Sequence, residues 1–218
     1  MAQKHTYILF DLDGTLTDPY EGITKSVQYS LRPFGIEAKQ EELTKFIGPP
    51  MRDSYRDYYG LNSEQTQAAI AKYRERFQEV GLYENELYDG ICEMLQALKD
   101  DGRILAVASS KPQVFVERIL DYFHIVEPFT CVCGSYLDGR RTEKVEVVEA
   151  VIEMLHIQDR SEALLVGDRI HDVVGAKKAG IECVGAAYGY GGRQELEEAG
   201  AVAVADTVAE LQELLLQM

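Results

Sequence analysis

The chain has 218 residues, which is more than one average domain of about 150 residues and fewer than two, so it favours a large domain carrying a smaller insertion. Acidic residues number 37 against 22 lysines and arginines, and the formal net charge of -15 repels a phosphate backbone and argues against nucleic acid as a partner. No apolar run approaches the roughly 20 residues of a membrane span, and the N-terminus lacks the apolar stretch of a secretory signal, so we expect a soluble, cytoplasmic protein without membrane contact.

The first predicted element is a buried strand over residues 7–10, which ends directly before Asp11. Asp11 and Asp13 then lie at the carboxyl end of this strand, just before Gly14, where open α/β sheets bind their ligands. An Asp-Gly turn that happens to follow an apolar run is the alternative, and a bare Asp-x-Asp pair leaves it open. The full string Asp11-Leu-Asp-Gly-Thr-Leu-Thr-Asp18 is far more specific than that pair.

Residues 17–88 contain no strand-like run, and we predict that they form an inserted helical domain. Apolar spacing compatible with helices occurs over residues 22–34, 41–46, 51–58 and 63–80. Ser63 and Glu64 offer an N-terminal cap and an early acidic residue for the last of these helices. Gly48-Pro49-Pro50 forces a stop between the second and the third.

After a predicted helix over residues 91–99, short apolar runs alternate with longer amphipathic segments. The predicted strands cover residues 104–108, 130–133, 163–166, 183–187 and, more weakly, 201–204, and a C-terminal helix follows over residues 208–217. Runs of this length bounded by Gly, Asp or Ser indicate parallel strands buried on both faces. We therefore predict an α/β fold, a doubly wound parallel sheet, as the core domain of residues 1–16 and 89–218.

The four cysteines are scattered through the chain, and no C-x-x-C pair with downstream histidines suggests zinc. Cys131 and Cys133 are two residues apart in a predicted strand, which places both on one face. We expect Cys92, Cys131, Cys133 and Cys183 to be reduced thiols that mostly pack in the core.

The string from Asp11 to Asp18 resembles the first motif of the haloacid dehalogenase superfamily of phosphatases, and three further motifs follow in the order and strand positions of that family. Ser109 follows the second core strand in Leu105-Ala-Val-Ala-Ser-Ser-Lys-Pro112, where the family keeps a Ser or Thr that binds a phosphate oxygen. Lys144 begins the helix after Asp138-Gly-Arg-Arg-Thr-Glu-Lys144, where the family keeps a lysine. Gly167-Asp168-Arg-Ile-His-Asp172 matches the family's acidic motif. The resemblance covers essentially the whole chain, and the helical insert corresponds to the family's cap.

The resemblance implies a phosphoric monoester hydrolase in which Asp11 is the nucleophile and forms an aspartyl-phosphate. An anionic nucleophile must approach a phosphate dianion, so charge has to be neutralised first, and a hard divalent cation such as Mg2+ meets this need. We predict Asp11, Asp168 and the backbone carbonyl of Asp13 as magnesium ligands, with Asp172 orienting metal-bound water. The Asp13 carboxyl is predicted to be the general acid and then the general base.

Lys144 and the Ser109 hydroxyl are predicted to bind the non-bridging phosphate oxygens, completed by backbone N–H groups near Leu12, Asp13 and Ser110. Each assignment has an alternative. Lys144 could be a solvated residue of a charged helix start, and Ser109 could cap the next helix, with Ser110 as a competing hydroxyl.

Three polar residues beside the motifs, Lys111, Arg169 and His171, stay without a role. Arg169 stands where the family often carries Thr or Ser, so it marks a subgroup or is a surface ion-pair partner.

The insert is similar in size and position to the small helical cap of the phosphoglycolate phosphatase-like branch, whose cap residues select the substrate. Candidates are Tyr20 and Arg52, the latter for a second anionic group. The Gly-Asp-Arg form of the fourth motif also resembles members known as 5'-nucleotidases, and a phosphomutase of the β-phosphoglucomutase type would use the same motifs. A metal-free dehalogenase fits less well because of the carboxylates Asp13 and Asp168, and a non-catalytic protein fits less well because no acidic motif residue is missing. We expect a small phosphorylated metabolite as the substrate, and the sequence leaves open a monomer or a homodimer.

Overall fold

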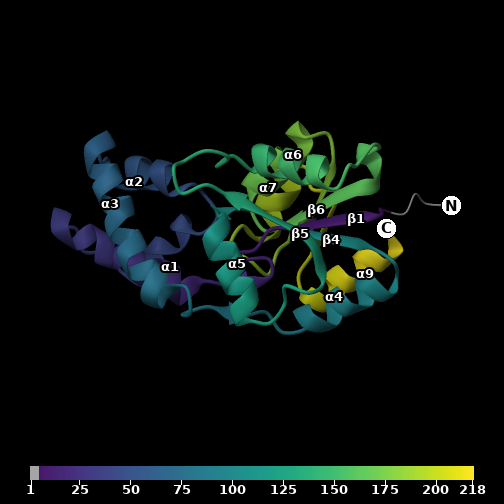
Figure 1. The fold of residues 1–218 in the computed structure, drawn as a ribbon. Coiled ribbons are helices and arrows are strands. Elements are labelled where there is room, and N and C mark those ends of the chain that lie inside the picture. Colours follow the sequence, from purple (N-terminus) through teal and green to yellow (C-terminus); the bar gives the residue numbers. More distant parts are fainter. Residues whose placement is uncertain (1–4) are drawn as a thin grey trace. The chain divides into compact units, whose positions relative to one another are not determined.

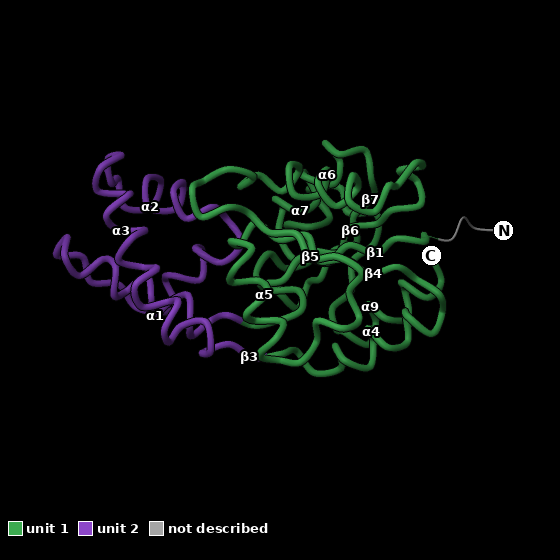
Figure 2. The backbone as a smooth tube through the Cα atoms, in the orientation of Figure 1, with its two compact units in different colours: residues 1–18, 87–218 green, residues 19–86 purple. Residues whose placement is uncertain are grey.

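A computed structural model describes residues 5–218 of the protein. The chain forms two compact units (Figure 2), one whose described residues are 5–18 and 87–218 and one of residues 19–86. Within the described part of the chain, no helix is both long and apolar enough to cross a bilayer.

A six-stranded parallel sheet forms the centre of the first unit, with the strand order β5-β4-β1-β6-β7-β8. The strands are β1 (Tyr7–Phe10), β4 (Ile104–Pro112), β5 (Phe129–Ser135), β6 (Ala163–Gly167), β7 (Glu182–Ala186) and β8 (Ala203–Ala205). Phe10 at the end of β1 pairs with Val107 in β4 and with Val166 in β6. The residues that follow these three positions therefore come together at one edge of the sheet. This arrangement confirms the predicted doubly wound α/β fold.

Helices cover both faces of this sheet (Figure 1). Their bounds are α4 (Ile91–Asp100), α5 (Gln113–Tyr122), α6 (Lys144–Met154), α7 (Ile170–Lys178), α8 (Gly192–Ala199) and α9 (Val208–Gln217). Leu9, Ala106 and Leu165 belong to one buried cluster with apolar residues of α6, α7 and α8. Their neighbours Ile8 and Phe10 are also fully buried, as the alternation of side chains along a strand requires when both faces are covered.

Two predicted strands differ from the observed ones in length. β4 continues beyond residue 108 through the polar residues Ser109, Ser110 and Lys111, because Pro112 still pairs with Ser135 of β5 after a register shift. β5 is likewise longer than its apolar run at both ends. A hydropathy pattern does not predict the polar end of β4, because these residues belong to the strand only through their pairing with β5.

The second unit consists of helices and the loops between them, and it ends at Glu86, the first residue of β3. Its helices are α1 (Tyr20–Leu31), η1 (Arg32–Phe34), η2 (Gln40–Phe46), α2 (Met51–Tyr59), α3 (Ser63–Arg76) and η3 (Phe77–Gly81). Where the chain passes from the first unit to the second and back, β2 (Thr17–Asp18) and β3 (Glu86–Leu87) form a two-stranded sheet that the sequence did not predict.

Two local predictions in this unit were wrong in detail. The segment predicted as a helix over residues 41–46 is a 3-10 helix, η2. The cap of α3 is Asn62 rather than Ser63, because the Asn62 side chain accepts from the Gln65 backbone N–H while the Gln65 side chain accepts from the Asn62 N–H.

All four cysteines are free thiols. Cys133 and Cys183 are buried and Cys131 is partly buried, whereas Cys92 is exposed, contrary to a core role for that residue. Burial, and then the neighbouring Cys133, raise the pKa of Cys131 to about 11. Such a thiol carries little thiolate at neutral pH, which fits a packing role.

A close backbone contact in the second unit yields a stability prediction. Gly22 lies inside α1, where alanine normally stabilises a helix by roughly 0.5–1 kcal/mol. A Cβ at this position would overlap the carbonyl oxygen of Gly81 and come 2.7 Å from that of Glu84. We therefore expect Gly22→Ala to lower the free energy of unfolding by about 1–3 kcal/mol, measured by urea denaturation.

Gly35→Ala is the matched control, because Gly35 has a positive φ of 68° but no atom within 4 Å of a Cβ. It should lose only about 1 kcal/mol for the left-handed backbone. A Gly22→Ala protein as stable as wild type would contradict the predicted overlap.

Candidate active site

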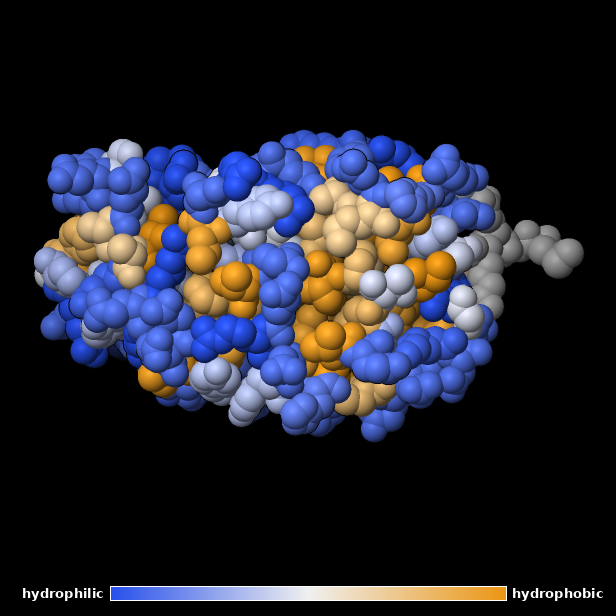
Figure 3. Space-filling model, in the orientation of Figure 1, coloured by the Kyte–Doolittle hydropathy of each residue, from blue (hydrophilic) through white to orange (hydrophobic). Residues whose placement is uncertain are grey.

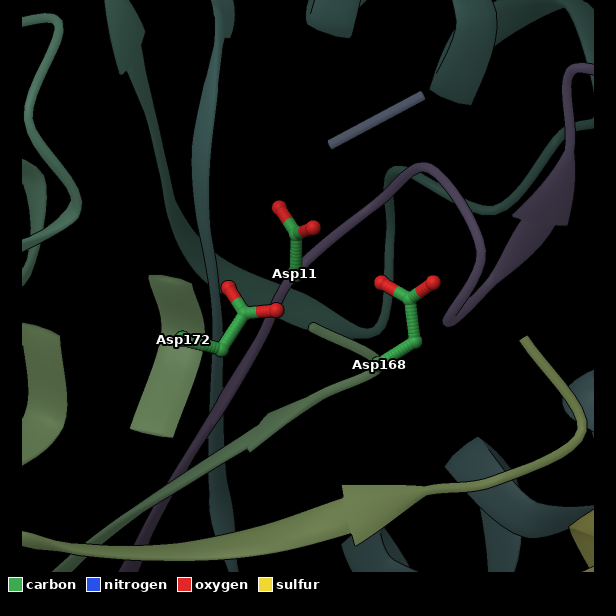
Figure 4. Close-up of side chains that lie close together, drawn as sticks. All are labelled: Asp11, Asp168 and Asp172. Carbon is green, nitrogen blue, oxygen red and sulfur yellow. The ribbon is translucent and has the colours of Figure 1, made fainter. Parts of the chain in front are cut away.

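Three buried carboxylates meet at the carboxyl edge of the sheet. Asp11 follows β1, Asp168 follows β6, and Asp172 lies in the first turn of α7. One oxygen from each lies within 4.8 Å of the other two. Figure 4 shows the three side chains turned toward a common space. The parallel register of β1 and β6 places Asp11 and Asp168 here, so the cluster follows directly from the sheet.

The charge and the free oxygen atoms of this cluster suit a hard cation. Asp168 Oδ2 accepts a hydrogen bond from the Tyr190 backbone N–H at 2.8 Å. Its Oδ1 is buried and has no hydrogen-bond partner among residues 5–218. Burial raises the pKa of Asp168 well above its usual range, and Asp172 and Asp11 raise it further. An all-oxygen donor set with an unpaired buried oxygen and excess negative charge is what Mg2+ requires. The residues present therefore fit this ion.

Lys144 is the cation of the cluster. Its Nζ lies 2.7 Å from Asp11 Oδ1 and 2.8 Å from Asp172 Oδ1, and it donates to the Ala108 carbonyl at 2.9 Å. Burial opposes the charged form of Lys144, but Asp11 and Asp172 outweigh it and raise the pKa of the ammonium. The alternative of a solvated lysine at a helix start is wrong, because the Lys144 side chain is only 5% exposed.

Asp13 forms a separate ion pair, outside the cluster of three carboxylates. Lys111 Nζ lies 2.7 Å from Asp13 Oδ1, and both side chains are nearly buried. Burial raises the pKa of Asp13, while Lys111 acts in the opposite direction. Lys111 has no role predicted from the sequence. The sequence signal for this ion pair is that Lys111 follows the apolar run of β4, which lies next to β1, the strand that precedes Asp13.

Ser109 and Ser110 lie in β4 close to this edge. Ser109 is buried, and its Oγ accepts from the Lys111 backbone N–H at 3.3 Å. It does not cap the following helix, because α5 begins at Gln113 with Pro112 at the N-cap. That alternative is wrong, and phosphate binding by Ser109 and Ser110 stays a prediction.

Arg169 is the N-cap residue of α7. Its Nε lies 3.0 Å from Glu195 Oε1, so the ion-pair interpretation holds. Its backbone N–H donates to Asp172 Oδ2 at 3.0 Å, which fixes the carboxylate that Lys144 also contacts. His171 is exposed on α7.

Tyr20 and Arg52 belong to the second unit. Tyr20 is the first residue of α1, and Arg52 is an exposed residue in the first turn of α2. Their roles as substrate contacts stay predictions.

Comparison with known proteins gives one family and several curated relatives. The family profile "Haloacid dehalogenase-like hydrolase" matches residues 8–186. A 5'-nucleotidase of Pseudomonas aeruginosa is 44% identical over 196 residues, which are 89% of this chain and 88% of that protein. The tyrosine-protein kinase PtkA of Mycobacterium tuberculosis is 38% identical over 95% of this chain and 72% of its own length. Phosphoglycolate phosphatase 1 of Pseudomonas aeruginosa is 30% identical over 94% of this chain and 77% of its own length.

A solved structure has nearly the same backbone. It is a crystal structure of "a predicted phosphatase from Clostridium acetobutylicum", with a TM-score of 0.96 and 43% identity, covering 99% of this chain and all of that one.

The raised pKa of Asp168 leads to a prediction about stability without metal. A carboxyl whose pKa is raised by folding stabilises the folded protein while it is protonated. Its contribution to the free energy of unfolding is therefore fully present below the ordinary pKa of 3.8 and is lost as the pH rises through the raised pKa. Asp168→Asn removes this penalty and keeps an oxygen for the Tyr190 N–H. In EDTA at pH 7.5 we expect the variant to have a free energy of unfolding about 1 kcal/mol or more above that of wild type, measured by urea denaturation. Near pH 3.5 we expect little difference between the two proteins.

Asp121→Asn, an exposed change on α5, is the control and should leave stability unchanged at both pH values. Mg2+ should raise the unfolding temperature of wild type and not that of Asp168→Asn. A destabilised Asp168→Asn protein at pH 7.5 in EDTA would contradict the charge argument.

Proposed function

The chain belongs to the haloacid dehalogenase-like hydrolases and is a phosphatase of that family, and we propose that it hydrolyses a small phosphomonoester with Mg2+ through an aspartyl-phosphate on Asp11. The observation that carries the proposal is the set of three buried groups beside Asp11: Lys144 Nζ lies 2.7 Å from its carboxylate, and one oxygen each of Asp168 and Asp172 lies within 4.8 Å of it. Asp11, Asp168 and the backbone carbonyl of Asp13 would hold the ion, with Asp172 beside them. Bound there, Mg2+ neutralises charge on the phosphate and on the carboxylates.

In the first half of the reaction, an Asp11 carboxylate oxygen attacks phosphorus, and the bond from phosphorus to the ester oxygen breaks. The departing oxygen needs a proton, which the Asp13 carboxyl donates. The raised pKa of Asp13 favours the protonated form that this step needs. In the second half, water attacks the phosphorus of the aspartyl-phosphate and gives a proton back to Asp13. Asp11 leaves as a carboxylate and inorganic phosphate is released.

Lys144 and Ser109 serve the phosphoryl group in this proposal. The Lys144 ammonium already lies beside the Asp11 oxygen, so it sits where charge develops on the transferring group. Ser109, in β4, supplies a hydroxyl, and Ser110 adds a backbone N–H. Three acceptors around Lys144 Nζ hold it in one place, which favours catalysis because no reorganisation is needed.

For the substrate, we favour a nucleoside 5'-monophosphate over phosphoglycolate. The 5'-nucleotidase relative is 44% identical to this chain over 196 residues, against 30% over 212 residues for the phosphoglycolate phosphatase. The relative named as a tyrosine-protein kinase makes phosphotyrosine a further candidate. A phosphomutase would instead return the phosphoryl group to a sugar, and a coupled assay for the isomeric sugar phosphate separates that outcome.

A substrate screen tests the proposal directly. Nucleoside monophosphates, phosphoglycolate, sugar phosphates and phosphotyrosine are supplied at equal concentration with Mg2+, and free phosphate is measured. We expect release in Mg2+ and none in EDTA, with the highest kcat/KM for a nucleoside 5'-monophosphate. Release that is equal in EDTA would contradict the metal requirement.

The nucleophile is tested by Asp11→Asn. We expect hydrolysis of p-nitrophenyl phosphate to fall by about 1000-fold or more, because the amide cannot form the covalent intermediate. Asp121→Asn should keep the wild-type rate. Activity that survives in Asp11→Asn would overturn the proposed mechanism.

The ion pair of Lys111 predicts a change in the pH profile. Lys111 lowers the pKa of Asp13, so Lys111→Met should raise it. Because Asp13 acts as an acid first, the alkaline limb of kcat/KM against pH should move to higher pH, with a rate loss of about 10-fold or more. Lys99→Met, which removes a lysine paired with Glu127, is the control and should leave the limb in place. An unmoved limb in Lys111→Met would rule out Asp13 as the group that titrates there.

A further inference from the structure

The loop of residues 187–191, between β7 and α8, holds both the side chain and the main chain of Asp168. We call it the tyrosine loop after Tyr188 and Tyr190. The Tyr190 backbone N–H donates to Asp168 Oδ2 at 2.8 Å, and the Gly191 N–H donates to the Asp168 carbonyl at 3.1 Å. Oδ2 is held in this way, whereas Oδ1 is buried and has no hydrogen-bond partner among residues 5–218.

The tyrosine loop packs against Asp168 without spare room. A Cβ at Gly189 would overlap the Asp168 Cβ and the Gly14 carbonyl and would lie 2.6 Å from Asp168 Oδ2. Asp168 itself is fully buried. The backbone of the loop at Gly189 is therefore in close contact with the Asp168 side chain.

Two phenol hydroxyls fasten the tyrosine loop to the segment that follows Asp13. Tyr188 OH donates to the Thr15 carbonyl at 2.9 Å, and Tyr190 OH donates to Asp18 Oδ1. Both phenols are the donors in these bonds, because a carbonyl oxygen and a carboxylate oxygen only accept.

A third tyrosine braces the same loop. The Tyr88 ring meets the Tyr188 ring edge to face, with centroids 5.1 Å apart, and the Tyr88 N–H donates to the Leu16 carbonyl at 3.2 Å. Asp18 directly precedes the second unit in the chain, and Tyr88 follows it by two residues. The tyrosine loop therefore connects Asp168 to both chain segments that flank that unit.

We propose that Tyr188 and Tyr190 are positioning residues for the magnesium site: their hydroxyls fix the tyrosine loop, and the loop fixes Asp168 so that its unpaired oxygen faces the cation. This inference rests on the proposed function in that it takes Mg2+ as the ion. Neither tyrosine is assigned a role by the four motifs. Groups that orient a metal ligand in this way commonly change metal affinity by 10–100-fold when they are removed.

The test is the double variant Tyr188→Phe/Tyr190→Phe, which removes two hydroxyls and keeps both rings. Mg2+ affinity is measured by calorimetry and by the Mg2+ concentration that gives half of the rise in unfolding temperature. We expect affinity to fall about 10-fold or more, while KM at saturating Mg2+ changes less than about threefold. Tyr122→Phe, an exposed tyrosine on α5, is the matched control and should bind Mg2+ like wild type.

Unchanged Mg2+ affinity in the double variant overturns the proposal. If the unfolding temperature in EDTA is lower while the affinity is unchanged, the hydroxyls act in folding alone. If the double variant does not fold, the two single variants Tyr188→Phe and Tyr190→Phe give the same comparison. Wild-type protein that binds Mg2+ but hydrolyses no phosphomonoester would overturn the proposed function and leave this inference to be decided by the binding data. Wild-type protein that binds no Mg2+ would overturn this inference.

Discussion

The ion pairs of Lys144 organise the carboxyl edge of the sheet. Four carboxylates, Asp11, Asp13, Asp168 and Asp172, are buried there with two lysines, so negative charge remains in excess. Lys144 contacts two of the carboxylates and a carbonyl of β4 at once, and removing it would leave all three without their cation. Such a set of charges opposes folding unless a cation is added. The protein therefore keeps a destabilising feature in its interior, and the proposed chemistry explains why.

The positions of these charges are set by the three central strands of the sheet. β1, β4 and β6 are neighbours in register, so the residues that follow them meet without help from long loops. Both faces of the sheet are covered by helices, and the β1 side chains that lead to Asp11 (Ile8, Leu9 and Phe10) are fully buried. The carboxylates thus stand on a rigid base of backbone hydrogen bonds, while the groups that orient them come from α7 and from the tyrosine loop.

Much of this could be predicted from the sequence because it is local. The apolar runs gave every core strand, and the motif spacing indicated Asp11, Asp13, Lys144 and Asp168. What was missed depends on pairing between distant segments. β4 extends through polar residues because β5 pairs with it, and Lys111 matters because β4 lies beside β1. The tyrosine loop reaches across more than 170 positions to Thr15 and Asp18, which no local pattern records.

The short strands β2 and β3 lie where residues 19–86 are inserted into the core domain, and their pairing affects how long such an insert can be. Because they pair with each other, the chain leaves and rejoins the catalytic unit at two points separated by about 5 Å, the spacing of adjacent strands. An insert between two such points adds chain without requiring a change in the strand order of the six-stranded sheet. The strand order of the core sheet therefore sets no limit on the length of the insert, so segments of different length fit this place in the chain.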